Sequence, residues 1–432
     1  MGQQKNNKGV LIAIIAMMFL FAMISFVTNM AAPFGQIWKI KYGWAGMMGN
    51  MMNFAAYLFM GIPAGIMITK IGYKKTALVA LFLGFLGICV QYLSSMQDPS
   101  NLSTYVIYLL GAFICGFCVC ILNTVVNPML NLLGGGGNKG NQYIQIGGSL
   151  NSLAGTCTPL LVGMLIGQVT DKTSMNDVAP LLIIAMAIFA ASFFIIFFTK
   201  IVEPEQADGN IGSSIKGALK YRHLVLGIIA IFFYVGVEVG IPGEMIFYIS
   251  VDNPTGLPNA AVIAGTIAAV YWLLMLVGRL TSSFISGAVS TRSQIVTVCV
   301  VALAFLLAAI FVPETSTFNL PGTKEAPLDL AIMQFSGGSV PMKCLFLVLC
   351  GLCTSVMWGG IFNLATEGLG KYTAAASGLF MTMVVGGGVM PLVQDFIATA
   401  AGYVASYWVV VAMVAYMLFY ALVGSKPSVK QE

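Results

Sequence analysis

Glu238 has the strongest claim to a chemical role in this chain. It lies inside an apolar run from about 224 to 249, and a charge at the centre of a bilayer costs about 3 kcal/mol on insertion scales. We therefore expect Glu238 to face a water-filled cavity, a partner or a proton. Tyr234 precedes it by one helical turn and shares its face. Gly240 and Pro242 weaken the helix just beyond, as in helices whose free carbonyls line a transport path.

Glu238 is also the candidate coupling residue. No other deep acid is identified along the apolar runs, so Glu238 would bind a proton, or would help to hold Na⁺ with nearby backbone carbonyls. The alternative is a carboxylate that only forms a hydrogen bond between helices. Glu244 lies near the end of the same run and is predicted to sit in a solvated mouth instead.

A set of amides occupies similar depths in other apolar runs. Amides both donate and accept hydrogen bonds, which suits a neutral polyol, and two aromatic rings can supply a flat surface on which a sugar stacks. For each amide, an interhelical hydrogen bond worth about 0.6 kcal/mol is an equally good explanation. The candidate substrate-binding residues are Asn123, Asn127, Gln145, Asn151, Tyr234, Glu238, Trp358, Asn363 and Gln394.

Membrane helices must position these residues. The chain has 432 residues, 59% of them hydrophobic and 8% charged, so it cannot hide its apolar surface in a water-soluble core. Twelve runs are long enough to cross a hydrocarbon layer of about 30 Å. The sequence predicts an all-α integral membrane fold with spans at 9–34, 44–69, 75–95, 103–133, 143–168, 179–200, 223–250, 260–282, 294–312, 343–366, 373–400 and 403–424.

The distribution of basic residues predicts the orientation of these helices. An even number of spans places both termini on one side, and that side receives 15 of the 20 lysines and arginines. Because basic loops stay in the cytoplasm, both termini are predicted to be cytoplasmic, in a multi-pass protein of the cytoplasmic (inner) membrane. The net charge of +5 therefore reflects topology and gives no case for nucleic-acid binding.

Residues that catalyse reactions or bind metals are scarce. His223 is the only histidine, which argues against a His-based triad or a His-ligated metal. Most of the nine cysteines lie in apolar runs, where cysteine usually packs as a small residue. A polytopic membrane enzyme is thus the least favoured class. No metal or cofactor is expected, apart from H⁺ or Na⁺ as a coupling ion.

A polar stretch separates six spans from six. It predicts an N-terminal six-helix half at 1–200, a cytoplasmic linker at 201–222 and a C-terminal half at 223–432. The halves echo each other, because GIPAGIMITKIGYKK at 61–75 follows the second span as GRLTSSFISGAVSTR at 278–292 follows the eighth. A parallel internal repeat predicts this placement.

Two groups of motifs resemble a known transporter family. The residues after the second span resemble the loop motif of the major facilitator superfamily, with Thr69 where that family prefers Asp. YVGVEV at 234–239, IFNLATEGLGKYT at 361–373 and VVGGGVMPLVQ at 384–394 resemble its fucose/galactose/glucose symporter branch. The predicted cytoplasmic gating residues are Gly65, Lys70, Gly72, Lys74, Lys75, Arg279 and Arg292.

The resemblance implies two pseudo-symmetric six-helix halves, a sugar substrate and cation symport. The family commonly has Asp in the first helix where this chain has Phe26, and Glu in the fourth where it has Asn123. Since both carboxylates are absent here, Glu238 is left as the expected deep carboxylate.

The predicted function is secondary active import of a monosaccharide or close derivative by alternating access, coupled to H⁺ or Na⁺. An exporter of small amphipathic compounds and an uncoupled sugar uniporter are the alternatives. The fourth span has no basic residue of the kind that drug exporters usually carry, which favours uptake. We expect a monomer whose partners are the sugar and the lipid bilayer, with an unusually long external loop at 313–341.

Overall fold

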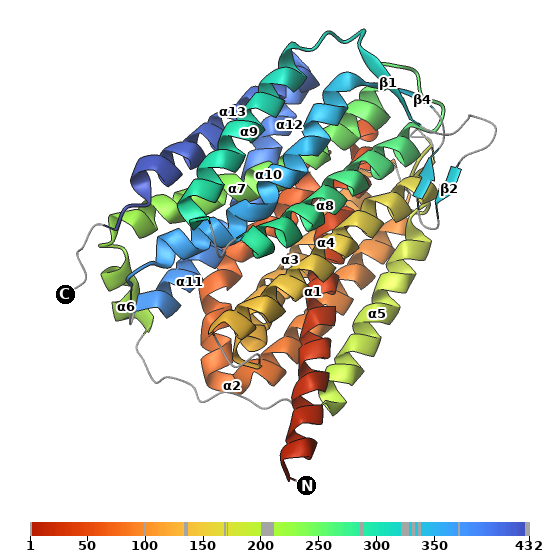
Figure 1. Cartoon of the computed structure of the whole chain (residues 1–432). Helices are drawn as coiled ribbons and strands as arrows, with labels where there is room; N and C mark the ends of the chain where they lie inside the picture. Colours follow the sequence, from red (N-terminus) through yellow and green to blue (C-terminus); the bar gives the residue numbers. More distant parts are fainter. Residues whose placement is uncertain are drawn as a thin grey trace.

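Twelve helical segments in the described part of the chain are long and apolar enough to cross a membrane, and they form one bundle (Figure 1). The structure, a computed structural model, describes residues 2–98, 100–133, 137–167, 170, 172–199, 211–285, 289–320, 328–330, 333–335, 338–369 and 372–427. The prediction of twelve spans is confirmed. They are Val10–Lys41, Met48–Ile68, Lys70–Ser95, Leu102–Asn127, Ile146–Ile166, Ala179–Phe198, Arg222–Asp252, Ala260–Ser282, Thr291–Phe311, Met342–Thr366, Gly378–Ala401 and Tyr403–Gly424.

Five helices carry the first six spans, because α2 contains two of them. The backbone of α2 leaves helical geometry at Gly72, where φ is 83°, a region that glycine enters without a Cβ penalty. The chain reverses direction there. As a result, the Tyr42 hydroxyl, just before α2, donates a hydrogen bond to the Ser100 carbonyl, just after α2, at 3.5 Å. The helices are α1 (Gly2–Lys41), α2 (Met48–Ser95), α3 (Leu102–Leu133), α4 (Gly137–Ile166) and α5 (Ala179–Phe198).

The second six spans follow a short connecting helix. Residues 201–210 of the predicted linker lie outside the described residues, and α6 occupies part of the remainder. The helices are α6 (Ile211–Ala218), α7 (Arg222–Phe247) with its continuation η1 (Tyr248–Asp252), α8 (Ala260–Ile285), α9 (Thr291–Phe311), α10 (Met342–Thr366), α11 (Thr373–Met383), α12 (Gly386–Ala401) and α13 (Tyr403–Phe419) with η3 (Tyr420–Gly424).

The predicted long loop at 313–341 carries two small hairpins. β1 (Thr317–Leu320) pairs antiparallel with β4 (Gly338–Pro341), and β2 (Leu328–Leu330) pairs antiparallel with β3 (Met333–Phe335). Figure 1 shows these strands at one end of the bundle and both chain termini toward the other. We call these two ends the strand side and the termini side.

Large apolar side chains cover the outside of the bundle. Phe198 and Phe311 are 77% and 71% exposed, and Phe59, Phe82 and Ile184 are also exposed. Water would penalise this much apolar surface, whereas lipid does not. The exterior therefore fits a membrane-embedded protein.

The first six spans meet the last six along two seams. α4 packs along α8, and α2 packs against α11 and α12. The contact is close where glycines lie, because a Cβ at Gly163 would come within 2.6 Å of the Ala261 carbonyl oxygen. On the second seam, a Cβ at Gly388 would lie 3.0 Å from the Met51 Cα. Glycine thus permits near-contact of backbones, as is common between membrane helices.

The eleventh span is broken into α11 and α12 just before three successive glycines. A Cβ at Gly386 would collide with the backbone carbonyl of Phe232 in α7, so α12 lies against α7 at the closest possible distance. Gly386→Ala should therefore destabilise the protein by about 1–3 kcal/mol, because a backbone atom cannot move aside as a side chain can. Thermal unfolding of the purified protein in detergent measures the loss.

Gly378→Ala is the matched control in the same span. No atom lies within 4 Å of a Cβ built at Gly378, and alanine has the higher helix propensity. We expect its unfolding midpoint to equal or exceed that of the unmodified protein. Equal midpoints for the two variants would show that α12 does not need its contact with α7.

Candidate functional site

Glu238 forms an ion pair with Arg279 inside the bundle. The Glu238 Oε1 and Arg279 Nη2 atoms are 3.5 Å apart, and the two side chains are only 12% and 15% exposed. Nη1 of Arg279 donates to the Gly148 carbonyl at 2.9 Å and to the Ser152 hydroxyl at 3.0 Å. Since Gly148 and Ser152 belong to α4, the ion pair links α7 and α8 to the first six spans. Glu238 therefore has the partner that its depth required.

Arg279 lies in a helix and not in a loop, whereas its predicted role in gating remains a prediction. Arg279 lies within α8, which continues to Ile285, so its side chain enters the bundle instead of the aqueous phase. The repeat pairs Arg279 with Ile62, which also lies inside a membrane span. A buried guanidinium requires an anion, and Glu238 supplies it.

The two aromatic residues proposed to stack on a sugar lie side by side. The ring centroids of Tyr234 and Trp358 are 6.1 Å apart in an edge-on arrangement, and Trp358 also packs on Phe380 at 5.7 Å. The Tyr234 hydroxyl is buried near Glu238 but outside hydrogen-bonding geometry. An aromatic wall with an unsatisfied hydroxyl thus stands beside the ion pair.

Asn123 and Asn127 lie next to the seam through α2. The Asn123 amide donates to the Tyr57 hydroxyl at 2.7 Å, and Tyr57 is within electrostatic range of Glu238. Asn127 donates to the Asn123 carbonyl at 3.0 Å within its own helix. Both side chains are half-buried, so α3 brings polar groups toward the ion pair.

Two other predicted amides form hydrogen bonds between helices. Asn151 donates to the Phe21 carbonyl at 2.9 Å, joining α4 to α1. Gln394 is buried between α7 and α13, where its amide donates to the Ser406 hydroxyl at 3.4 Å. The interhelical alternative therefore describes these contacts. The side chain of Gln145 lies outside the described residues.

Asn363 does not join the other amides. Its side chain is exposed, whereas Gly360, Ile361 and Leu364 form the buried face of α10. Position 363 falls on the opposite side of the helix, because successive residues rotate by about 100°. Sugar contact by Asn363 remains a prediction.

A small cavity between the two halves reveals residues that the sequence analysis did not select. It measures about 20 Å³, enough for one water molecule, and Thr28, Asn29, Asn50 and Trp272 contribute to its wall. Asn50 donates to the Gly387 carbonyl at 2.7 Å, across the seam, while its Oδ1 has no partner in the described part of the chain. The sequence could have indicated this cavity, because Thr28 and Asn29 are polar residues inside the first apolar run and Asn50 is one inside the second.

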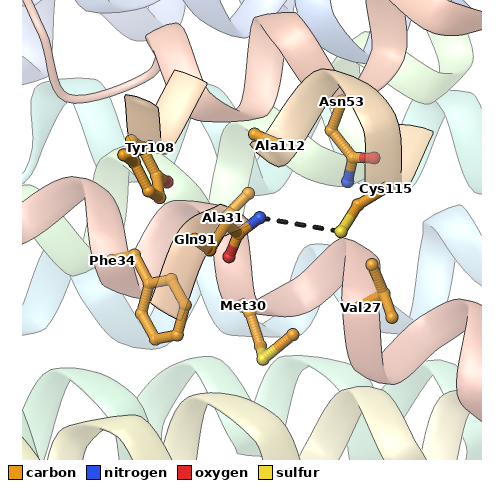
Figure 2. A pocket seen from close by; sticks show the side chains of 9 residues that line it. All are labelled: Val27, Met30, Ala31, Phe34, Asn53, Gln91, Tyr108, Ala112 and Cys115. Atoms are coloured by element: carbon orange, nitrogen blue, oxygen red, sulfur yellow. Dashed lines mark hydrogen bonds between the residues drawn. The ribbon is translucent and has the colours of Figure 1, made fainter. Parts of the chain in front are cut away.

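A second cavity lies within the first six spans (Figure 2). It measures about 10 Å³ and is lined by residues of α1, α2 and α3. The Gln91 side-chain amide donates to the Cys115 sulfur at 3.7 Å. The side-chain oxygens of Gln91 (Oε1) and Asn53 (Oδ1) have no protein partner among the described residues. Its size and its place inside one half suit a single bound water better than a sugar.

Comparison with known proteins settles the family. The model of the Major Facilitator Superfamily matches residues 10–324. The chain belongs to this superfamily.

Named relatives extend over nearly the whole chain. A glucose/galactose transporter of Brucella abortus biovar 1 (strain 9-941) is 27% identical, covering 98% of this chain and 96% of the relative. A putative glucose/galactose transporter of Helicobacter pylori (strain ATCC 700392 / 26695) is 24% identical, with 98% of each covered. The L-fucose-proton symporter of Escherichia coli (strain K12) is 23% identical, covering 90% of this chain and 86% of the relative.

Solved structures share the fold. A crystal structure of the E. coli fucose:proton symporter superposes with a TM-score of 0.68 at 20% identity, covering 96% of this chain and 98% of that one. At this identity the likeness confirms the architecture of a major facilitator protein.

The superfamily's loop motif contacts the end of α5. Lys74 donates to the carbonyls of Phe197 and Thr199 at 2.7 and 2.8 Å, where a cation complements the helix dipole. Gly72 supplies the turn, and Lys70 and Lys75 are exposed. This part of the motif therefore joins elements within the first six spans.

The remaining predicted gating residues make little contact. A Cβ at Gly65 would meet no atom within 4 Å, and the Thr69 side chain lies outside the described residues. Arg292, in the first turn of α9, is half-buried and within electrostatic range of Tyr420. A gating role for these residues remains a prediction.

A second buried ion pair lies on the strand side. Lys39 of α1 pairs with Asp395 of α12, and both side chains are buried. Lys39 also donates to the Thr399 hydroxyl at 3.1 Å, and the Met47 amide lies 3.4 Å from Asp395 Oδ2. These contacts join the two halves at the end opposite Arg279. They hold the two halves together on the strand side.

Three expectations about charged residues are corrected by this ion pair. Lys39 is buried because α1 continues to Lys41 instead of ending near 34. Glu244 is fully buried rather than solvated, because α1 and α12 pack against this part of α7. Asp395 was not recognised, so Glu238 is one of three deep carboxylates in the described part of the chain.

Proposed function

We propose that this protein imports a monosaccharide by alternating access of its two six-helix halves, coupled to H⁺ or Na⁺. The ion pair of Glu238 and Arg279 carries the proposal, because it sits between the halves beside the Tyr234 and Trp358 rings. The names of the relatives, which act on glucose, galactose or fucose, support a sugar as the substrate. We further propose a monomer that needs no bound cofactor beyond the coupling ion.

Coupling follows from competition for the Glu238 carboxylate. A proton or Na⁺ on Glu238 cancels the charge that holds Arg279, so Arg279 can give up its position on Gly148 and Ser152. That contact crosses the α4–α8 seam, and its loss favours separation of the halves at that point. The ion and the sugar thus act on the same equilibrium.

Asn123→Ala should weaken sugar binding by about 1–3 kcal/mol, because a sugar hydroxyl or the Tyr57 hydroxyl would lose its amide partner. Equilibrium binding of labelled glucose, galactose and fucose to purified protein measures the change. Asn176→Ala is the control, since Asn176 is exposed in the connection before α5. Equal affinity of the two variants would exclude Asn123 from the site.

Transport in proteoliposomes tests the function itself. We expect counterflow of a monosaccharide, and accumulation when a pH or Na⁺ gradient is imposed. Counterflow without accumulation under either gradient would identify a uniporter. Movement of amphipathic compounds without counterflow of any monosaccharide would instead favour an exporter.

We propose that the termini side faces the cytoplasm, because 15 of 20 basic residues belong to it by sequence. A single cysteine at Ser316, before β1, should react with a membrane-impermeant maleimide in intact cells. A single cysteine at Ser213 should react only after the membrane is opened; its side chain lies outside the described residues. Reversed accessibility at both positions would overturn this orientation.

A further inference from the structure

The strand-side ion pair belongs to a larger buried charge cluster. Glu244 of α7 interacts electrostatically with both Lys39 and Asp395. Lys39 also lies over the rings of Phe247 and Tyr403, 5.3 and 5.6 Å from their centroids. Residues from α1, α7, α12 and α13 therefore meet at one point where the two halves touch.

The charges of this cluster do not balance. One ammonium group faces two carboxyl groups, and the contacts of Lys39 go to Asp395 and Thr399. Both oxygens of Glu244 are fully buried and have no hydrogen-bond partner among the described residues. An ionised carboxylate in that position would be a charge with neither water nor a donor, which proteins avoid by neutralising it.

Among the described residues, Lys39 is the one cation near Glu244. Phenols and thiols are neutral near pH 7, and the Tyr407 hydroxyl already donates to the Ile241 carbonyl at 3.1 Å. The titratable groups around the cluster are Lys39, Asp395, Tyr403 and Tyr407, with Tyr248 and Cys344 next to Tyr407 and Tyr105 next to Asp395.

We propose that Glu244 binds a proton whenever the halves are closed on the strand side, and that it releases this proton when they separate there. Separation breaks the Lys39–Asp395 pair and admits water to Glu244, which then ionises as a water-exposed glutamate does near neutral pH. Closing takes the proton up again. A more acidic solution on the strand side therefore favours the closed state.

A proton fits this site better than Na⁺. A metal cation requires several oxygen ligands, whereas the Glu244 oxygens have no polar neighbour within bonding distance among the described residues. The Lys39 ammonium would also repel a metal cation. The Glu244 proton enters and leaves on the strand side, so it sets the position of the gate without being carried across. It is thus distinct from the coupling ion proposed for Glu238, and it does not depend on the substrate.

The labelling rate of a cysteine introduced into the cavity wall reports how often the strand side opens. Ala32→Cys, in a background whose nine native cysteines are replaced by alanine, puts a thiol beside Gly243 on the wall of the central cavity. A membrane-impermeant maleimide added to intact cells reaches this thiol when the strand side opens. The same measurement with Glu244→Gln, which has no proton to release, gives the pH dependence of the reagent itself.

The measured quantity is the labelling rate divided by the labelling rate of the Glu244→Gln variant. We expect this ratio to rise with external pH by up to about tenfold per pH unit, because one proton is released on opening. Asp395→Asn should flatten this dependence independently, because Lys39 then neutralises an ionised Glu244. Asp252→Asn, which removes an exposed carboxylate farther along the same span, should keep it. A ratio that does not change with pH, or an unchanged slope in Asp395→Asn, would overturn the proposal.

Discussion

Glu238→Gln should abolish accumulation of sugar against a gradient while leaving exchange across the membrane intact. Glutamine keeps the shape of the side chain but cannot bind and release a proton, and it attracts a cation much less than a carboxylate does. Because glutamine imitates the neutralised side chain permanently, Arg279 can leave Gly148 and Ser152 without a bound ion, so the halves still move and exchange continues. Uptake of radiolabelled sugar into proteoliposomes, with and without an imposed gradient, separates the two activities.

Asp252→Asn is the matched control for this experiment. Asp252 lies at the end of the same span, about four helical turns beyond Glu238, and its side chain is exposed. We expect accumulation by this variant to equal that of the unmodified protein. If Glu238→Gln still accumulates sugar, coupling must rest on another deep acid, and the role assigned to the Glu238–Arg279 pair is wrong.

Lys39→Met should destabilise the protein by about 3–5 kcal/mol, because it leaves the buried Asp395 without its partner next to a second carboxyl group, Glu244. Methionine is apolar and nearly as long as lysine, so lost packing contributes little. The midpoint of thermal unfolding in detergent reports the change.

A second variant separates the charge effect from a packing effect. Adding Asp395→Asn to Lys39→Met removes the unpaired charge, so most of the lost stability should return. Lys172→Met, which removes an exposed lysine, should leave the unfolding midpoint unchanged. If the double variant is no more stable than Lys39→Met alone, the pair does not hold the strand side closed.

The two buried ion pairs lie toward opposite ends of the seam between the halves. Arg279 reaches α4 toward the termini side, whereas Lys39 reaches α12 toward the strand side. Each includes a carboxyl group that can be neutralised. The Lys39–Asp395 pair crosses from one half to the other, whereas Glu238 holds the arginine that bonds to the other half. A carrier that alternates access needs one closing contact at each end, and these pairs meet that requirement.

Local sequence determined the twelve spans and the residues that share a helical face. In a bilayer each helix satisfies its own backbone hydrogen bonds, so length and apolar composition are enough to identify it. The same periodicity placed Tyr234 one turn before Glu238, and the structure adds that its hydroxyl is near that carboxylate. Asn363 shows the limit, because periodicity relates residues within one helix and does not say which face meets the neighbours.

Tertiary packing decided which charges are paired. Arg279 follows Glu238 by some 40 positions, and Lys39 and Asp395 come from the first and eleventh spans, so each pairing depends on the order and rotation of helices in the bundle. Glu244 is the clearest case. Its place near the end of an apolar run suggested solvent, but the packing of α1 and α12 against that span left the carboxyl group buried beside Lys39 and Asp395. Burial is a property of all the surrounding helices together, and no single apolar run contains it.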